Sequence, residues 1–112
     1  MVDLESIRAM QAAHKVWLDH NFPNQQPHDG LLGISEEVGE LCHAHLKGQQ
    51  GIRHTPEQIE ELKFDALGDI FIFMLSYCNT NEIQLADAIE DTWTKIVSRR
   101  DWITNTQDGV TA

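Results

Sequence analysis

The sequence predicts an all-α protein, and three observations lead to that prediction. Apolar residues recur three and four positions apart in four separate segments, which is the spacing of one helix face. No window alternates apolar and polar residues as a half-buried strand does, and stretches rich in Pro, Gly or Asn separate the segments. We therefore expect a four-helix bundle with short connections, in a single domain over residues 1–103 followed by a disordered tail over residues 104–112.

The first two expected helices end at clear breaks in this pattern. The first helix covers about residues 4–20, and one of its faces carries Ile7, Met10, His14, Trp17 and Leu18. The segment NFPNQQPHDG then stops it, because prolines and a glycine do not continue a helix. The second helix covers about residues 30–47 and ends before the loop GQQGIRH.

The third helix has an explicit start signal. Thr55, Pro56 and Glu57 supply an N-cap, a proline at the first helical position and an acid in the first turn. We expect this helix over about residues 56–78. After the short turn NTNE, the fourth helix is expected over about residues 83–102, with Trp93 in the core.

Composition and charge argue against several classes of function. The 112-residue chain carries 18 acidic and 8 basic residues, a formal net charge of −10, and such a chain repels nucleic-acid backbones. The longest apolar run, IFIFML, is far shorter than the roughly 20 residues of a membrane span. Cys42 and Cys78 lie in apolar runs without a CxxC pair, so we expect two reduced, buried thiols. These features predict a soluble, cytoplasmic protein without a membrane or nucleic-acid partner.

Acidic residues gather in two segments that are otherwise apolar. SEEVGEL carries Glu36, Glu37 and Glu40, and KFDALGDIFIFML carries Asp65 and Asp69 one helical turn apart. The helix around the glutamates is apolar over most of its circumference, so we expect it to be buried with its acids facing a cleft. One pair of glutamates usually marks a solvated face, but two such groups on antiparallel neighbouring helices favour a shared site. Because few cations are near enough to pair them, a hard cation such as Mg²⁺ is the expected partner.

The same two segments carry a family resemblance. SEEVGELCHAHLKGQQGIR followed by DALGDIFIFML resembles the MazG-type all-α nucleoside triphosphate pyrophosphohydrolases, whose pattern is EExxE on one helix and ExxD on the next. The similarity covers about residues 28–102, including KIVSRRDW near its end. It implies a MazG-like bundle whose core is completed by dimerisation, as a homodimer or a homotetramer. It also implies Mg²⁺-dependent cleavage of (d)NTPs to (d)NMP and pyrophosphate, with Mn²⁺ as a substitute metal.

The resemblance assigns roles to the acidic residues. Glu37, Glu40 and Asp69 match metal ligands of the family pattern, and Glu36 matches the leading glutamate, which joins the metal site or orients the attacking water. The chain departs from the pattern at Ala66, where the family has the first acid of ExxD. Asp65, a full turn before Asp69, is the expected replacement, and this shift puts the metal count and geometry in doubt.

Basic and aromatic residues complete the expected substrate site. The cations at or near helix ends are candidates to hold the polyphosphate, with Lys95 and Arg99 the preferred pair: Lys47, Arg53, Lys95, Arg99 and Arg100. For any single one, a solvated surface cation is the alternative interpretation. For His14 and Trp17, we favour a position in the core, with stacking on a nucleotide base as the alternative.

Two rival functions stay open at this stage. Glu40 and His43 form a Glu-x-x-His motif, as in ferritin-like bundles that bind two irons, but the chain has only one such motif. A non-catalytic helical module that binds a nucleotide or a partner helix is the second rival, and Ala66 supports it. The favoured function is nucleotide pyrophosphohydrolysis for house-cleaning or nucleotide-pool control, without a predicted base or sugar preference.

Overall fold

A computed structural model describes residues 3–99, and all of its regular structure is helical. The four helices are α1 (Glu5–Asn21), α2 (Asp29–Gln50), α3 (Pro56–Thr80) and α4 (Leu85–Arg99). The predicted all-α fold with four helices is confirmed, and the helix bounds agree with the expected ones to within a few residues. The expected end of the fourth helix and the tail over residues 104–112 lie outside the described residues.

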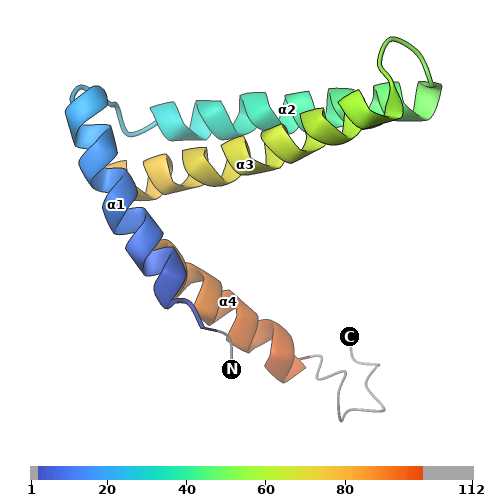
Figure 1. Ribbon diagram of the computed structural model, residues 1–112. Helices are drawn as coiled ribbons and strands as arrows, with labels where there is room; N and C mark the ends of the chain where they lie inside the picture. The colour runs from blue at the N-terminus through green and yellow to red at the C-terminus, as the bar shows by residue number, and fades with distance from the viewer. Residues whose placement is uncertain (1–2, 100–112) are drawn as a thin grey trace.

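The helices form an open, L-shaped arrangement (Figure 1). α2 and α3 pack side by side as a long antiparallel hairpin, α1 packs against α3 near the end of that helix, and α4 packs on α1 and runs away from the hairpin. The radius of gyration is 17.8 Å, whereas a compact chain of this length has about 13 Å. A single chain therefore leaves much of its helix surface without a neighbour.

Local signals explain where the hairpin helices begin and end. The Oγ1 atom of Thr55 accepts a hydrogen bond from the backbone N–H of Gln58 (3.2 Å), and the Oε1 atom of Gln58 accepts one from the backbone N–H of Thr55 (2.8 Å). The N-cap at Thr55 and Pro56 at the start of α3 are the start signal that the sequence predicted, and Gln58 completes a capping box with Thr55. α2 ends at Gly51, which has a left-handed φ of 68° that suits glycine.

Glycines let α2 and α3 approach closely. A Cβ atom at Gly30 would lie 2.6 Å from the backbone N of Tyr77, and one at Gly33 would overlap the ring of Phe73. Near the turn, a Cβ atom at Gly48 would lie 3.0 Å from Cγ2 of Ile59. From Gly30 to Gly48 the residue number along α2 rises by 18, and from Tyr77 to Ile59 the number along α3 falls by 18. The hairpin thus keeps one antiparallel register along its length.

The apolar core lies where α1, α3 and α4 meet. Leu75, Cys78 and Leu85 are its buried members. Partly buried apolar side chains pack around them: Ile7, Phe71, Ile72, Met74 and Ile89. The core thus sits at the corner of the L, away from the turn of the hairpin.

Several residues expected in the core are exposed in the single chain. On α2, which was expected to be buried, Leu31, Leu32, Val38 and Leu46 are exposed, and so is the thiol-bearing Cys42. The reason is that, among residues 3–99, α2 packs mainly on α3, through a narrow face rich in small residues. Trp17 and Trp93 are 49% and 40% exposed, because α1 and α4 have few neighbours on those faces. Cys78 is buried as predicted.

None of the helices in the described part of the chain has both the length and the apolar character that crossing a membrane requires.

Candidate functional site

The hairpin register brings the two acidic segments together. Glu37 is four residues after Gly33 on α2, and Asp69 is four residues before Phe73 on α3, the residue that Gly33 contacts. Glu37 and Asp69 therefore face each other across the hairpin, and both are half-buried. The two other glutamates of the motif lie beside Glu37 and are exposed.

Glu37 is the electrostatic centre of this acidic group. Burial is the largest cause that raises the pKa of Glu37 above its ordinary value, and the negative charges of four other acids add to the effect. In order of decreasing influence, these are Asp69, Glu36, Glu40 and Asp65. Each of the five acids predicted from the sequence thus belongs to one electrostatic cluster. Within residues 3–99, none of the five forms an ion pair.

Asp65 does not occupy the place of the missing glutamate. Ala66 is 3% exposed and packs against α2, in register with Glu40. Asp65 is one residue earlier, about 100° around the helix, and is exposed. It lines a shallow hollow of α3 and the preceding loop with His54, Gln58, Glu61 and Leu62. Its charge has the least influence on Glu37, consistent with a position at the margin of the cluster.

The chemistry of these residues fits a hard divalent cation. Carboxylate oxygens are the ligands that Mg²⁺ prefers, and a cation would relieve the repulsion that raises the pKa of Glu37. In the part of the chain described by the structure, however, no three His, Cys, Asp or Glu side chains converge closely enough to hold a metal ion. The carboxylates are assembled on one edge of the hairpin without forming a closed ligand set.

The candidate phosphate-binding cations lie in two separate places. Lys47 is on α2, ten residues or about 15 Å beyond Glu37, and its Nζ donates to Oε1 of Gln50 (3.0 Å). Arg53 is exposed in the loop before α3, with a positive φ of 78°. Both belong to the same hairpin as the acids.

Lys95 and Arg99 lie on α4, which extends away from the hairpin (Figure 1). Lys95 pairs with Asp91 (2.8 Å), and Nε of Arg99 donates to the carbonyl of Lys95 (3.3 Å). The preferred pair is therefore not brought to the acids within one chain. Arg100 lies outside the described residues.

His14 and Trp17 are located at the α1 end of the acidic edge. Ser76, which contacts His14, lies seven residues after Asp69 on α3, a rise of about 10 Å. Seven residues make about two helical turns, so Ser76 and Asp69 lie on the same face of α3. His14 is buried, and its ring contacts that of Trp17 with centroids 5.5 Å apart. Trp17 in turn contacts Phe22 at 5.6 Å, and both of these rings are about half exposed.

The polar partners of His14 were missed from the sequence. Its ring nitrogens contact Ser76 and Asn79, and Gln11 is hydrogen-bonded to Asn79. A signal was present, because Ser76 and Asn79 are hydrogen-bonding residues next to the most apolar stretch of the chain. Buried polar side chains need partners, so such positions indicate a polar contact with another helix.

Comparison with known proteins gives one match. The family model of the MazG nucleotide pyrophosphohydrolase domain matches residues 25–104, which span α2, α3 and α4. No curated protein and no solved structure matches the chain significantly.

Proposed function

Because the chain belongs to the MazG nucleotide pyrophosphohydrolase domain family, we propose that it is a Mg²⁺-dependent enzyme that cleaves (d)NTPs to (d)NMP and pyrophosphate. The observation that supports this most directly is the hairpin register, which sets Glu37 against Asp69 with Glu36 and Glu40 beside them. Mn²⁺ is the expected substitute metal. The physiological role that we propose is house-cleaning or control of nucleotide pools in the cytoplasm.

In this proposal, the acidic residues have different roles at the reacting phosphate. Glu37, Glu40 and Asp69 would hold the cation, with Asp65 at the margin of the cluster, and Glu36 would accept a proton from the attacking water. A bound Mg²⁺ supplies positive charge to the phosphate oxygens and makes water a better nucleophile. Half-buried Glu37, surrounded by negative charge, gains most from a cation.

The rest of the substrate extends along the hairpin and towards α1. In the proposal, Lys47 and Arg53, on the turn side of the acids, hold the departing pyrophosphate. Trp17 offers an exposed ring at the other end for stacking on the base, with the ring of His14 behind it. Asp69 and Ser76 are about 10 Å apart along α3, which leaves room for a nucleoside between the acids and the ring of Trp17.

A homodimer or homotetramer is part of the proposal. Apolar side chains on both hairpin helices are exposed, including Leu31, Val38 and Leu46 on α2 and Phe64, 84% exposed, on α3. Burial of such a surface is the usual reason for association. A second subunit would also bring its own α4, and so Lys95 and Arg99, within reach of the acids.

The activity is tested by pyrophosphate release from a panel of canonical and modified (d)NTPs, with and without Mg²⁺ or Mn²⁺. We expect turnover that requires the metal and is lost in Glu37→Gln and Asp69→Asn. Glu57→Gln, which removes an exposed acid from the first turn of α3, is the matched control and should stay active. Mg²⁺-independent turnover, or loss of activity in the control alone, would contradict the proposal.

A non-catalytic module of the same fold is the second candidate function. Buried Ala66 favours it, because no acid projects from that position towards Glu40. Tight nucleotide binding without pyrophosphate release across the whole panel would support this candidate over the enzyme.

A further inference from the structure

A buried polar network joins α1, α3 and the start of α4. Gln11, His14 and Ser76 are only 5%, 7% and 4% exposed, and half-buried Asn79 lies between them. In the described residues, no buried side-chain nitrogen or oxygen lacks a hydrogen-bond partner. The network is therefore complete, and adding or removing one proton changes its balance of donors and acceptors.

Backbone groups fix the orientation of Gln11 at one end of the network. The backbone N–H of Leu85 can only donate, so Oε1 of Gln11 accepts from it (2.9 Å). Nε2 of Gln11 then donates to the carbonyl of Ile83 (2.8 Å) and to Oδ1 of Asn79 (3.1 Å). One side chain of α1 thus satisfies the first backbone N–H of α4 and a carbonyl of the preceding turn.

The orientation of Asn79 determines the proton position on His14. Since Oδ1 of Asn79 is an acceptor, its Nδ2 donates, both to the carbonyl of Gln11 (3.1 Å) and to Nδ1 of His14 (3.2 Å). Nδ1 of His14 must therefore carry no proton. The neutral ring then has its proton on Nε2, which donates to Oγ of Ser76 (3.2 Å).

The network has no arrangement that accepts a second proton on His14. A proton on Nδ1 would point at the Nδ2 donor of Asn79, and turning that amide would place its oxygen against the carbonyl of Gln11. Burial also lowers the pKa of His14. Within about two helical turns of the network, the titratable groups on these elements are Glu5, Arg8, Lys15, Asp19 and His20 of α1, Asp69, Tyr77 and Cys78 of α3, Glu82 of the turn and Asp87, Glu90 and Asp91 of α4. Within residues 3–99, no ion pair joins His14 to a carboxylate that would stabilise its charged form.

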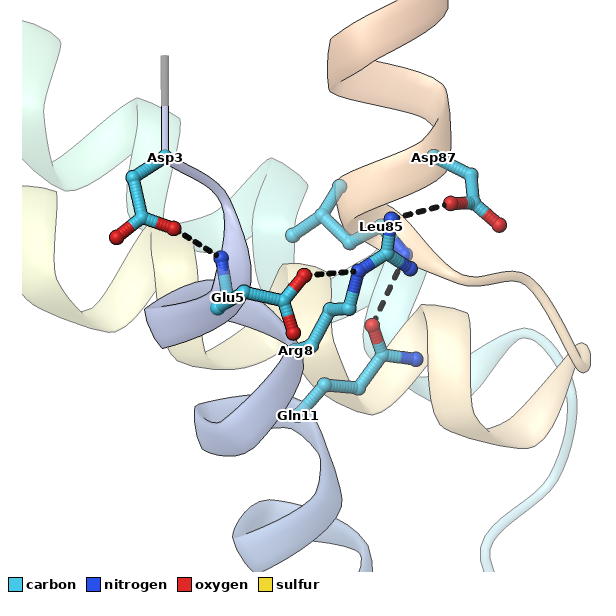
Figure 2. Close-up of polar contacts among 6 residues, drawn as sticks. All are labelled: Asp3, Glu5, Arg8, Gln11, Leu85 and Asp87. Carbon is cyan, nitrogen blue, oxygen red and sulfur yellow. Dashed lines mark hydrogen bonds and ion pairs between the residues drawn. The ribbon is translucent and has the colours of Figure 1, made fainter.

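We propose that this network is a proton-sensitive latch, which holds the start of α4 on α1 and α3 while His14 is neutral and releases it when His14 takes up a proton. α4 packs mainly on α1, and besides the apolar packing of Leu85 in the core, two polar contacts attach its first turn there (Figure 2). One is the bond from Leu85 to Gln11, and the other is the ion pair of Arg8 with Asp87 (2.7 Å). That ion pair is solvent-accessible and therefore weak. The latch does not depend on the proposed catalytic activity.

The first test is NMR of the full chain labelled with ¹⁵N, in which ring nitrogen shifts report the tautomer and its titration. We expect His14 in the Nε2–H form, with a pKa below the ordinary histidine value. As His14 titrates, the protection of the Leu85 amide against hydrogen exchange should fall. An Nδ1–H tautomer, a His14 pKa at or above the ordinary histidine value, or unchanged protection of Leu85 would each overturn the latch.

The second test uses variants that change the charge next to His14. Asn79→Asp places a carboxylate on Nδ1, which stabilises the protonated ring, so the pKa of His14 should rise above its value in the wild type. Asn24→Asp, an exposed position with the same chemical change, should leave the pKa of His14 unchanged. If the pKa of His14 in Asn79→Asp is no higher than in the wild type, the assigned network is wrong.

The third test is the pH dependence of unfolding. Because folding lowers the pKa of His14, the unfolded chain binds more protons, and stability falls as pH drops below the ordinary histidine pKa. The folding equilibrium constant should decrease about tenfold per pH unit from this residue, until the folded-state pKa is reached. His14→Gln should remove that contribution and His20→Gln should not. Equal pH dependence in both variants would contradict the proposal; if His14→Gln does not fold, the NMR titrations still decide.

Discussion

Because α2 and α3 approach closely at Gly30, we expect a larger residue at this position to lower the stability of the protein. Its missing Cβ would lie 2.6 Å from the backbone N of Tyr77, 2.9 Å from its Cα and 3.0 Å from the carbonyl O of Phe73. These are backbone atoms, so they do not rotate away as a side chain would. Overpacking of this kind costs about 1–3 kcal/mol, and the better helix propensity of alanine returns roughly 0.5–1 kcal/mol. We expect Gly30→Ala to lower the free energy of unfolding by up to about 2.5 kcal/mol.

Two other glycines on the same helices are the matched controls. A Cβ at Gly39 or Gly68 meets no atom within 4 Å, so alanine there should raise stability by about 0.5–1 kcal/mol. Gly33→Ala should be intermediate, because its obstacle is the ring of Phe73, which can turn. Equilibrium urea unfolding, followed by far-UV circular dichroism, gives all four values. If Gly30→Ala is as stable as Gly39→Ala, the helices are not as close as the register requires.

Gly30→Ala should also change the environment of the acidic cluster. Forcing α2 and α3 apart at Gly30 moves Glu37 away from Asp69 and exposes it to water. Burial and the charge of Asp69 are the two largest causes of its raised pKa, so that pKa should move towards the ordinary glutamate value. Carboxyl ¹³C NMR of Glu37 in both proteins measures the change. An unchanged pKa of Glu37 in a destabilised Gly30→Ala would refute the link between helix spacing and the site.

The remaining predictions concern the acids and the α1–α4 contact. Mg²⁺ should raise the melting temperature of the wild type by mass action but not that of Glu37→Gln, and equal responses would remove Glu37 from the metal site. The pKa of Glu37 is raised in the folded state. Protonated Glu37 therefore contributes its full stability below the unfolded-state pKa, and this contribution is lost as pH rises through the folded-state pKa. Glu37→Gln should accordingly gain stability over the wild type at neutral pH, and urea unfolding at acidic pH should show the gain disappear. In pyrophosphate-release assays, Asp69→Asn should abolish turnover, whereas Asp65→Asn should cost roughly 10–100-fold as an outer partner of the ligands; a fully active Asp65→Asn would mean that Asp65 is only a solvated neighbour. Gln11→Leu leaves the buried N–H of Leu85 without its partner and should lower the free energy of unfolding by about 1–3 kcal/mol, and unchanged urea unfolding would contradict that bond.

The sequence predicted the local structure well because the signals for it are local. Thr55, Pro56 and Gln58 start α3 through contacts within one turn, and Gly51 ends α2 through its own backbone conformation. The acidic motif was visible for the same reason, since spacing along a helix places residues on one face. The sequence did not show whether Asp65 can replace the family glutamate that is missing at Ala66, because that depends on which of the two residues faces α2.

Burial was predicted less well. Periodicity showed that α2 is apolar around most of its circumference, but burial requires neighbours, and within one chain α2 contacts mainly α3. Leu31, Val38 and Cys42 are exposed for this reason. Whether a second subunit covers them stays a prediction, since it depends on a surface that one chain does not contain.

By itself, the sequence determined four helices, where most of them begin and end, and two acidic groups at helical spacing. These features depend on backbone propensity and side-chain spacing, which act over one or two turns. Only the tertiary structure decided that Glu37 faces Asp69, that Lys95 and Arg99 lie away from the acids, and that His14 is enclosed by Ser76 and Asn79. Those outcomes depend on how closely Gly30 and Gly33 let two helices approach and on where α1 crosses α3, and both are contacts between residues far apart in the chain.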